Sequence, residues 1–254
     1  MTKTAIACAA LRLAACGALD LDAPLAEAGA SLRALLRHDA RLPDYVALPA
    51  YRAAVAAREP AWPTDDLLAR CAGLPRPEGW AYSNIGYLHA RRALERAAGT
   101  GLDRLLATEV LRPAGLARTR LARGVEDLPH LPDLAGYDFG WVYHGCLIGP
   151  PAEAAAMMAA ILDGPLLDAG GRAAMNDVRR VGGAIPGRIW TECGYGLGLM
   201  SGRAGRVAMT GHSGGGPGVT CAVYRTGGRI AAAFSTAPSE AVPERAALRA
   251  APRP

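Results

Sequence analysis

The chain changes its local pattern about three quarters of the way along. Up to about residue 185, most segments carry apolar residues at the three- and four-residue spacing that is typical of helices. From Arg188 onward, short β-prone runs follow one another, separated by Gly, Ser and Thr turns. A block of helices followed by a block of strands favours an α+β fold with an antiparallel sheet over a regularly alternating parallel fold.

The helical spacing predicts helices at about Thr4 to Cys16, Leu25 to Arg37, Tyr51 to Arg58, Thr64 to Cys71, Ile85 to Ala98, Leu102 to Leu111, Ala152 to Leu162 and Glu240 to Ala250. The β-prone runs predict a meander of strands at Ile189 to Met200, Arg206 to Thr210, Val219 to Arg225 and Arg229 to Ser235. We expect a single domain over residues 1–254. Its sheet-containing part comprises residues 1–24 and about 186–254, and its mostly helical part comprises about 25–185.

The composition is that of an ordinary folded protein, with 51% hydrophobic and 20% charged residues in 254. No stretch approaches the roughly 18 apolar residues of a membrane-spanning helix. The 28 Lys and Arg residues exceed the 23 acidic ones, but they are scattered, without long runs or interleaved aromatic residues. We therefore expect neither a membrane span nor a nucleic-acid partner.

The sequence carries no pattern for a metal or cofactor. Its six cysteines include no C-x-x-C pair, which argues against a zinc ribbon or a thioredoxin-like site. The histidines outside the last strands lack metal-ligand spacing such as H-E-x-x-H: His38, His89, His130 and His144. We expect no metal and no cofactor.

One basic residue differs from all the others. Of the 28 Lys and Arg residues, 27 are arginine and Lys3 is the sole lysine. Burial can lower the pKa of a lysine by several units, whereas a guanidinium stays protonated. Lys3 is therefore a candidate general base, although a solubilising charge near the N-terminus would explain it equally well.

Two short motifs add candidates for a site. Tyr82-Ser83-Asn84 heads a predicted helix, where a phenol could relay protons and a carboxamide could hydrogen-bond a substrate amide. Ser83 or Asn84 could also simply cap that helix. His212-Ser213-Gly214 ends a predicted strand, and the glycines beyond it would let a substrate backbone lie against the strand edge, or form a tight turn.

The spelling Gly211-His212-Ser213-Gly214-Gly215 also fits G-x-S-x-G, the nucleophile elbow of α/β-hydrolases. That elbow requires a helix directly after the serine and a histidine later in the chain. Glycines and a predicted strand follow Ser213, and no histidine follows His212. The pattern therefore argues against an elbow.

Taken in order, Lys3, Tyr82-x-Asn84 and His212-x-Gly214 resemble the serine β-lactamase and penicillin-binding-protein superfamily, specifically its class C-like serine hydrolases with S-x-x-K, Y-x-N and H-x-G motifs. The likeness covers nearly the whole chain. It includes the stretches Leu35 to His38, Leu42 to Tyr45, Arg112 to Leu116, Gly194 to Gly198 and Gly211 to Gly218.

The resemblance implies acyl transfer through an acyl-serine intermediate, with Lys3 and Tyr82 sharing the role of base. It implies that Asn84 holds the substrate amide and that His212, Ser213 and Gly214 line the acyl pocket. The backbone N–H of Gly215 would complete the oxyanion hole. The implied substrate is a small-molecule or peptide-like acyl compound: a β-lactam, an ester, an amide or a D-amino-acid peptide.

The S-x-x-K motif places its serine directly before Met1, and every serine of the sequence lies after Lys3. We expect a serine codon upstream of Met1 in a longer gene, so that the chain as written is inactive. A nucleophile-free binding protein is the alternative.

A third reading takes Leu13 to Cys16 as a lipoprotein attachment site. A signal peptide on a longer chain would make the protein periplasmic or extracellular, and the chain as written would be cytoplasmic. Oligomeric state stays open.

Overall fold

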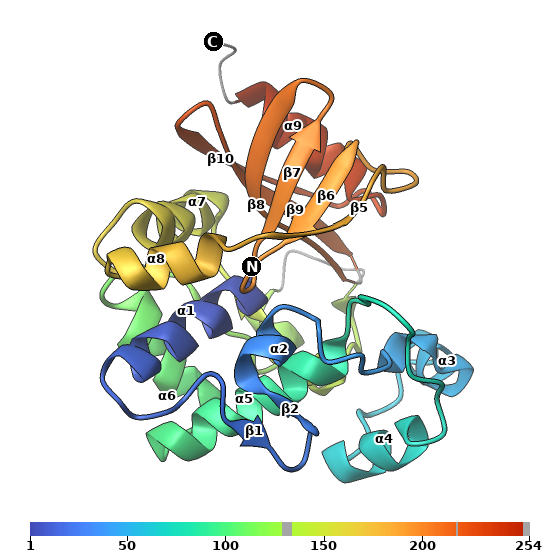
Figure 1. Ribbon diagram of the computed structural model, residues 1–254. Helices are drawn as coiled ribbons and strands as arrows, with labels where there is room; N and C mark the ends of the chain where they lie inside the picture. Colours follow the sequence, from blue (N-terminus) through green and yellow to red (C-terminus); the bar gives the residue numbers. More distant parts are fainter. Residues whose placement is uncertain (129–133, 217, 251–254) are drawn as a thin grey trace.

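The structure is a computed structural model that describes residues 1–128, 134–216 and 218–250 (Figure 1). His130, considered above as a metal ligand, and Pro217, within the Gly211 to Gly218 stretch, lie outside these residues. The helices are α1 (Thr2–Ala15), α2 (Leu32–Leu36), α3 (Pro49–Ala56), α4 (Thr64–Cys71), α5 (Asn84–Ala98), α6 (Leu102–Leu106), α7 (Pro151–Leu162), α8 (Ala169–Asn176) and α9 (Ala241–Ala250). The strands are β1 (Pro24–Leu25), β2 (Ala30–Ser31), β3 (Arg120–Leu121), β4 (Leu147–Ile148), β5 (Arg179–Gly182), β6 (Glu192–Tyr195), β7 (Met200–Ala204), β8 (Val207–Gly216), β9 (Val219–Thr226) and β10 (Arg229–Ser235). Short 3-10 helices occur at Tyr45–Ala47, Val125–Asp127 and Phe139–Trp141, and a π-helical turn at Ala107–Leu111 continues α6.

The strands of the C-terminal third form one antiparallel sheet in the order β10-β9-β8-β7-β6-β5. Helices α7 and α9 both pack against β9 and β10. In Figure 1 the sheet and α9 occupy the upper end of the molecule, and α1 to α6 occupy the lower end. This arrangement confirms the predicted α+β architecture.

Glycine turns set the register of the sheet. Gly227 and Gly228 both have positive φ, 52° and 78°, and they join β9 to β10 by a two-residue turn. Turns of this kind match the twist of antiparallel strands and favour glycine. The hairpin predicted at this point is therefore confirmed.

Ser213 lies inside strand β8 and not at a strand-to-helix turn. The expectation that Gly211 to Gly215 do not form a nucleophile elbow is therefore confirmed.

Helix α1 runs through the centre of the molecule. Its residues from Ala5 to Ala10 are completely buried, and it packs against α5, α6 and α8. The Thr4 hydroxyl donates to the Gly198 carbonyl at 2.8 Å. Gly198 has φ +66°, and a Cβ there would lie 2.8 Å from the Lys3 carbonyl oxygen, so only glycine lets the β6–β7 turn approach the helix this closely. This contact fixes the N-terminal end of α1 against the sheet.

Two of the predicted elements are wrong in detail. The segment from Leu25 to Arg37, predicted as one helix, forms the small hairpin β1–β2 followed by the short helix α2. Gly29, with φ +61°, makes the turn of the hairpin. The Ser31 hydroxyl caps α2 by accepting a hydrogen bond from the Ala34 N–H. The strand predicted from Ile189 to Met200 is two strands, β6 and β7. Helix α8 and strand β5 were not predicted. In the part of the chain that the structure describes, no helix is long and apolar enough to cross a membrane.

Candidate active site

A cleft of about 1540 Å³ lies between the helical part and the sheet. The start of α1 and the end of β8 both line it, and Figure 1 shows the N-terminus close to the lower ends of the sheet strands. The cleft brings together all seven residues that the sequence put forward: Lys3, Tyr82, Asn84, His212, Ser213, Gly214 and Gly215.

Lys3 lies in the first turn of α1 with only 6% of its surface exposed. Its Nζ donates to Asn84 Oδ1 at 2.7 Å and lies 2.9 Å from His144 Nε2. Burial lowers the pKa of Lys3 to about 7, against the opposing effects of the Asp44 carboxylate and Cys146. At neutral pH a large fraction of this amine is therefore unprotonated and able to accept a proton.

Asn84 is held in one orientation by its neighbours. The preceding Ser83 caps α5 by accepting from the Gly86 N–H at 3.1 Å. Asn84 Nδ2 donates to both carboxylate oxygens of Asp44, at 3.1 and 3.0 Å. Since the amide nitrogen can only donate and the carboxylate can only accept, Oδ1 must face Lys3. Asp44 thus holds the amide nitrogen of Asn84.

Residues 38 to 44 support the Tyr82-Ser83-Asn84 turn from outside. The Ser83 hydroxyl donates to the Pro43 carbonyl at 2.7 Å, and the Ser83 N–H donates to His38 Nδ1 at 3.1 Å. The His38 ring stacks on Tyr82 with 4.1 Å between ring centroids. The motif therefore holds its shape through contacts with a segment about 40 residues earlier in the chain.

Tyr82 presents the face of its ring to the lysine. Lys3 Nζ lies 5.1 Å from the Tyr82 ring centroid and 5.3 Å from that of Tyr87, within the range of a cation–π contact. Among the described residues, Lys3 hydrogen-bonds to Asn84 and His144 and not to the Tyr82 hydroxyl. The shared base role of Lys3 and Tyr82 stays a prediction.

The opposite wall of the cleft is β8. His212 Nε2 lies 2.9 Å from the Tyr195 hydroxyl. Burial, reinforced by the nearby amino group of Met1, holds the pKa of His212 well below its ordinary value, so the ring is neutral. Gly214 and Gly215 continue the strand without side chains, and a Cβ on Gly215 would lie 3.1 Å from Glu240 Oε1. This wall therefore offers mainly backbone to the cleft.

The Ser213 hydroxyl belongs to a charge cluster formed by Arg188 and Glu240, which are partly exposed, and by Glu244, which is buried. It donates to Glu240 Oε2 at 2.9 Å and accepts from Arg188. Arg188 in turn pairs with Glu240 at 2.7 Å and with Glu244 of α9. The hydroxyl is thus engaged with α9 and the segment before it, while Ser213 still forms part of the cleft lining.

Several residues of the site were not expected from the sequence: His38, Asp44, His144, Arg188, Tyr195 and Glu240. Asp44 follows Pro43 in the Leu42 to Tyr45 stretch that carries the family resemblance, which is the sequence signal for it. His144 lies in a segment without periodicity and offered no signal. In the described residues, no group of three or more His, Cys, Asp or Glu side chains is arranged to hold a metal ion.

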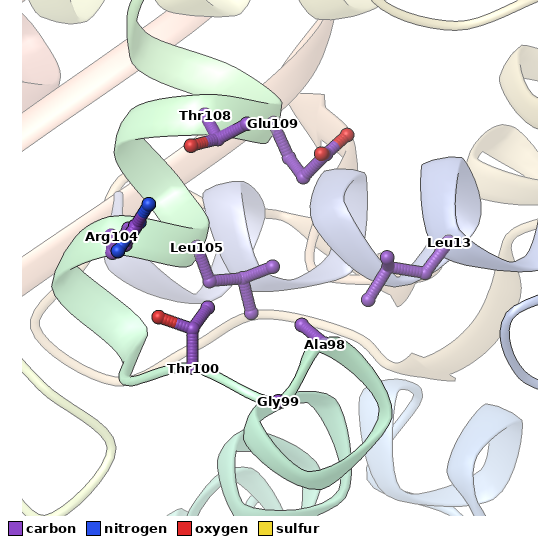
Figure 2. A pocket seen from close by; sticks show the side chains of 8 residues that line it. All are labelled: Leu13, Ala98, Gly99, Thr100, Arg104, Leu105, Thr108 and Glu109. Carbon is purple, nitrogen blue, oxygen red and sulfur yellow. The ribbon is translucent and has the colours of Figure 1, made fainter.

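A second hollow of about 510 Å³ lies elsewhere on the helical part (Figure 2). It is lined by Leu13 of α1, the end of α5 and residues of α6 and the π-helical turn, including Arg104 and Glu109. Glu109 is paired with Arg12 at 3.0 Å. None of the residues put forward from the sequence lines this hollow, so the large cleft is the candidate site.

Comparison with solved structures finds the same fold in several amide-cleaving enzymes. A D-stereospecific amidohydrolase from Streptomyces sp. is 24% identical with a TM-score of 0.81, over 98% of this chain and 84% of that one. The D-amino acid amidase from Ochrobactrum anthropi SV3 is 23% identical with a TM-score of 0.76, over 92% and 76%. An octameric penicillin-binding protein homologue from Pyrococcus abyssi is 20% identical with a TM-score of 0.74, over 98% and 63%.

No curated protein matched the sequence. The beta-lactamase family, however, matches residues 1–252, which is nearly the full chain and includes every residue of the cleft described above. The solved structures agree with this match in fold. The chain therefore belongs to the beta-lactamase family, the superfamily of serine hydrolases and penicillin-binding proteins.

Proposed function

We propose that the cleft is an acyl-transfer site in which Lys3 acts as the general base toward a serine. The observation that carries the proposal is the buried Lys3 amine, whose pKa falls to about 7 and which two fixed neighbours hold in place. An amine in this state accepts a proton at neutral pH, as activation of a serine hydroxyl requires. A guanidinium at this position could not.

The proposed reaction starts from a serine three residues before Lys3, one helical turn away on the same face. That position falls directly before Met1. The amine takes the hydroxyl proton while the serine oxygen attacks the acyl carbon. The N–H groups of the serine and of Gly215 stabilise the oxyanion. The leaving group then departs with a proton from Lys3 or Tyr82, and water hydrolyses the acyl-serine.

The proposed substrate is a small acyl compound: an ester, an amide or a peptide of a D-amino acid. Two fold relatives are described as a D-stereospecific amidohydrolase and a D-amino acid amidase. The cleft volume of about 1540 Å³ leaves room for a substrate of dipeptide size. Proposed contacts are Asn84 with the substrate amide, and His212, Ser213 and Gly214 with the acyl group.

A binding protein that forms no acyl-enzyme is the second candidate, because among the described residues no serine hydroxyl hydrogen-bonds to the Lys3 amine. In that case the cleft would hold a peptide-like ligand reversibly. The two candidates differ in one property, covalent capture of an acyl or phosphonyl group.

The proposal is tested by adding a leader that ends in serine directly before Met1, which recreates S-x-x-K. A leader ending in alanine is the matched control. We expect a fluorophosphonate probe to label the serine-extended protein at that serine, and to label neither the alanine-extended protein nor the chain as written.

Lys3→Arg in the serine-extended protein should abolish labelling while the protein stays folded. Labelling that survives this change would refute the role of Lys3. A folded serine-extended protein that resists fluorophosphonate and penicillin, but binds penicillin reversibly, would favour the binding protein.

A further inference from the structure

The Lys3 amine has two polar neighbours on separate parts of the chain. Asn84 Oδ1 lies 2.7 Å away at the start of α5. His144 Nε2 lies 2.9 Å away, in the segment between the 3-10 helix Phe139–Trp141 and β4. Both distances are those of hydrogen bonds, and His144 is 8% exposed. Nothing in the acyl-transfer scheme above uses this histidine.

In a neutral amine, the contact with His144 determines the direction of the lysine lone pair. An unprotonated lysine nitrogen carries two N–H bonds and one lone pair in tetrahedral directions. If Asn84 alone accepted a hydrogen bond, rotation about the Cε–Nζ bond would spread the lone pair over two directions. With both N–H bonds donated, to Asn84 and to His144, the lone pair has one direction left.

His144 is electrically suited to accept such a bond. Among the described residues, the groups that face it are Lys3, the amino group of Met1, Arg91 and the titratable rings of His38 and Tyr87, none of which is negatively charged at pH 7. Burial, together with these groups, holds the pKa of His144 well below its ordinary value, so the ring is neutral at pH 7. A neutral imidazole has one bare nitrogen that can accept.

The other ring nitrogen makes no competing hydrogen bond within the described residues. His144 Nδ1 is buried without a hydrogen-bond partner among the described residues. The ring also packs against Tyr87, with 6.3 Å between centroids. A histidine kept only for packing could be replaced by an apolar residue that leaves no polar atom unsatisfied. The contact at Nε2 is the polar contact that this side chain makes.

We propose that His144 is a positioning residue, which accepts a hydrogen bond from Lys3 at Nε2 and, with Asn84, directs the lone pair of the amine toward the nucleophile. The proposal rests on the proposed function of Lys3 as a base. It assigns His144 no contact with substrate.

The test uses the single lysine of the chain. Protein labelled with ¹³C at lysine Cε gives one NMR signal, whose pH titration reports the pKa of Lys3 alone. We compare wild type with His144→Leu, which has no acceptor, and His144→Gln, whose amide oxygen can accept. His89→Leu is the matched control, since the charged groups around that buried histidine are Glu27, Arg92 and Arg96.

A neutral acceptor stabilises the ammonium form more than the amine. We therefore expect the Lys3 pKa to fall by about one unit or more in His144→Leu, because a hydrogen bond to a charged group is worth at least that much. It should stay near the wild-type value in His144→Gln and in His89→Leu. A Lys3 pKa that is unchanged in His144→Leu would mean that His144 contributes only packing. A raised Lys3 pKa would mean that His144 is cationic in the wild type. Either result overturns the proposal.

The lone-pair direction has its own readout in the serine-extended protein. Above the Lys3 pKa in each protein, His144→Leu should be labelled at least about tenfold more slowly than wild type, because a misdirected base is costly even when unprotonated. His144→Gln should recover most of that loss. Equal rates for all three proteins at high pH would overturn the positioning role.

A wild-type measurement keeps the proposal testable if His144→Leu does not fold. Side-chain ¹⁵N spectra should show the His144 ring as the Nδ1–H tautomer, identified by the signals that His144→Gln lacks. An Nε2–H tautomer or a doubly protonated ring would overturn the proposal.

The two proposals can fail separately. If the serine-extended protein is not labelled but the Lys3 pKa shifts as expected, the acyl-transfer function fails and the Lys3–His144 hydrogen bond stands. If labelling occurs but neither the pKa nor the high-pH rate responds to His144→Leu, the function stands without His144.

Discussion

The two walls of the cleft bury charge in opposite ways. On the helical wall, Lys3 is buried and no carboxylate of the described residues pairs with it, since Asn84 lies between it and Asp44. Behind the strand wall, Glu244 of α9 is completely buried but receives hydrogen bonds from Arg188, Trp190 at 2.9 Å and Tyr224 at 2.8 Å. The charge of Lys3 therefore has no ion-pair partner among the described residues, whereas the charge of Glu244 is paired with Arg188.

The difference appears in the pKa values. Burial lowers the pKa of Lys3 to about 7, because the nearby Asp44 carboxylate and Cys146 compensate only in part for the lost water. Burial alone would raise the pKa of Glu244, but the hydrogen bond and the charge of Arg188, together with the hydrogen bonds from Tyr224 and Trp190, outweigh it and hold that pKa below its ordinary value. An unpaired buried group becomes reactive near neutral pH, whereas a paired one stays charged and serves the fold.

The strand wall should therefore respond to substitution mainly through stability. Glu244→Gln removes the carboxylate beside a largely buried Arg188 and should lower the free energy of unfolding by about 3 to 5 kcal/mol. Glu240→Gln, at a more exposed partner of the same arginine, should cost about 1 kcal/mol or less. Urea denaturation of both variants measures the difference, and equal losses would contradict the contrast between paired and isolated charge.

A smaller effect is expected from the backbone of the same wall. Gly211 has φ +157°, and a Cβ there would lie 1.9 Å from the Val223 carbonyl oxygen on β9. Gly211→Ala should therefore push β8 away from β9 just before His212, at a cost of about 2 to 3 kcal/mol.

Gly216→Ala provides the control on the same strand, because a Cβ there meets nothing within 4 Å. Its free energy of unfolding should stay within about 0.5 kcal/mol of wild type. A Gly211→Ala protein as stable as Gly216→Ala would show that β8 does not depend on this close approach.

The helical wall should behave in the opposite way: replacing its charged residue, Lys3, should increase the free energy of unfolding. The folded state lowers the Lys3 pKa from 10.5 to about 7, so between these values the unfolded chain binds more protons and wild-type stability rises with pH. Lys3→Met lacks this dependence. At pH 6 its free energy of unfolding should exceed that of the wild type. This difference should shrink by about 1 to 2 kcal/mol between about pH 7 and 8.5.

Comparing the two proteins cancels the buried tyrosines and cysteines, whose pKa values are raised and which destabilise both proteins at alkaline pH. Chemical denaturation at several pH values checks the prediction. A margin that is constant with pH would mean that Lys3 keeps an ordinary pKa in the folded state.

Local patterns predicted most of the fold, since helix periodicity and glycine turns are visible in neighbouring residues. The hairpin at Gly227-Gly228 and the helix from Thr64 to Cys71 are examples. The segment from Leu25 to Arg37 was misjudged, because its apolar spacing suits a helix while the turn at Gly29 and the cap at Ser31 break it.

The candidate site was predictable only where short motifs marked it. Lys3, Tyr82-x-Asn84 and His212-x-Gly214 were found because their residue types and order resemble a known family. His144 was not found, since its contact with Lys3 spans 141 residues and depends on tertiary packing. Glu244 reads as an ordinary surface charge on a terminal helix, and only the packing of α9 buries it.

The central claim is that the fold lowers the pKa of Lys3 enough for a large fraction of the amine to be unprotonated, and therefore reactive, at neutral pH. The ¹³Cε titration of the sole lysine in the unmodified chain tests this directly and needs no nucleophile or substrate. We expect a pKa of about 7 for this lysine. A value at or near the ordinary 10.5 would contradict it and leave Lys3 without the role of base.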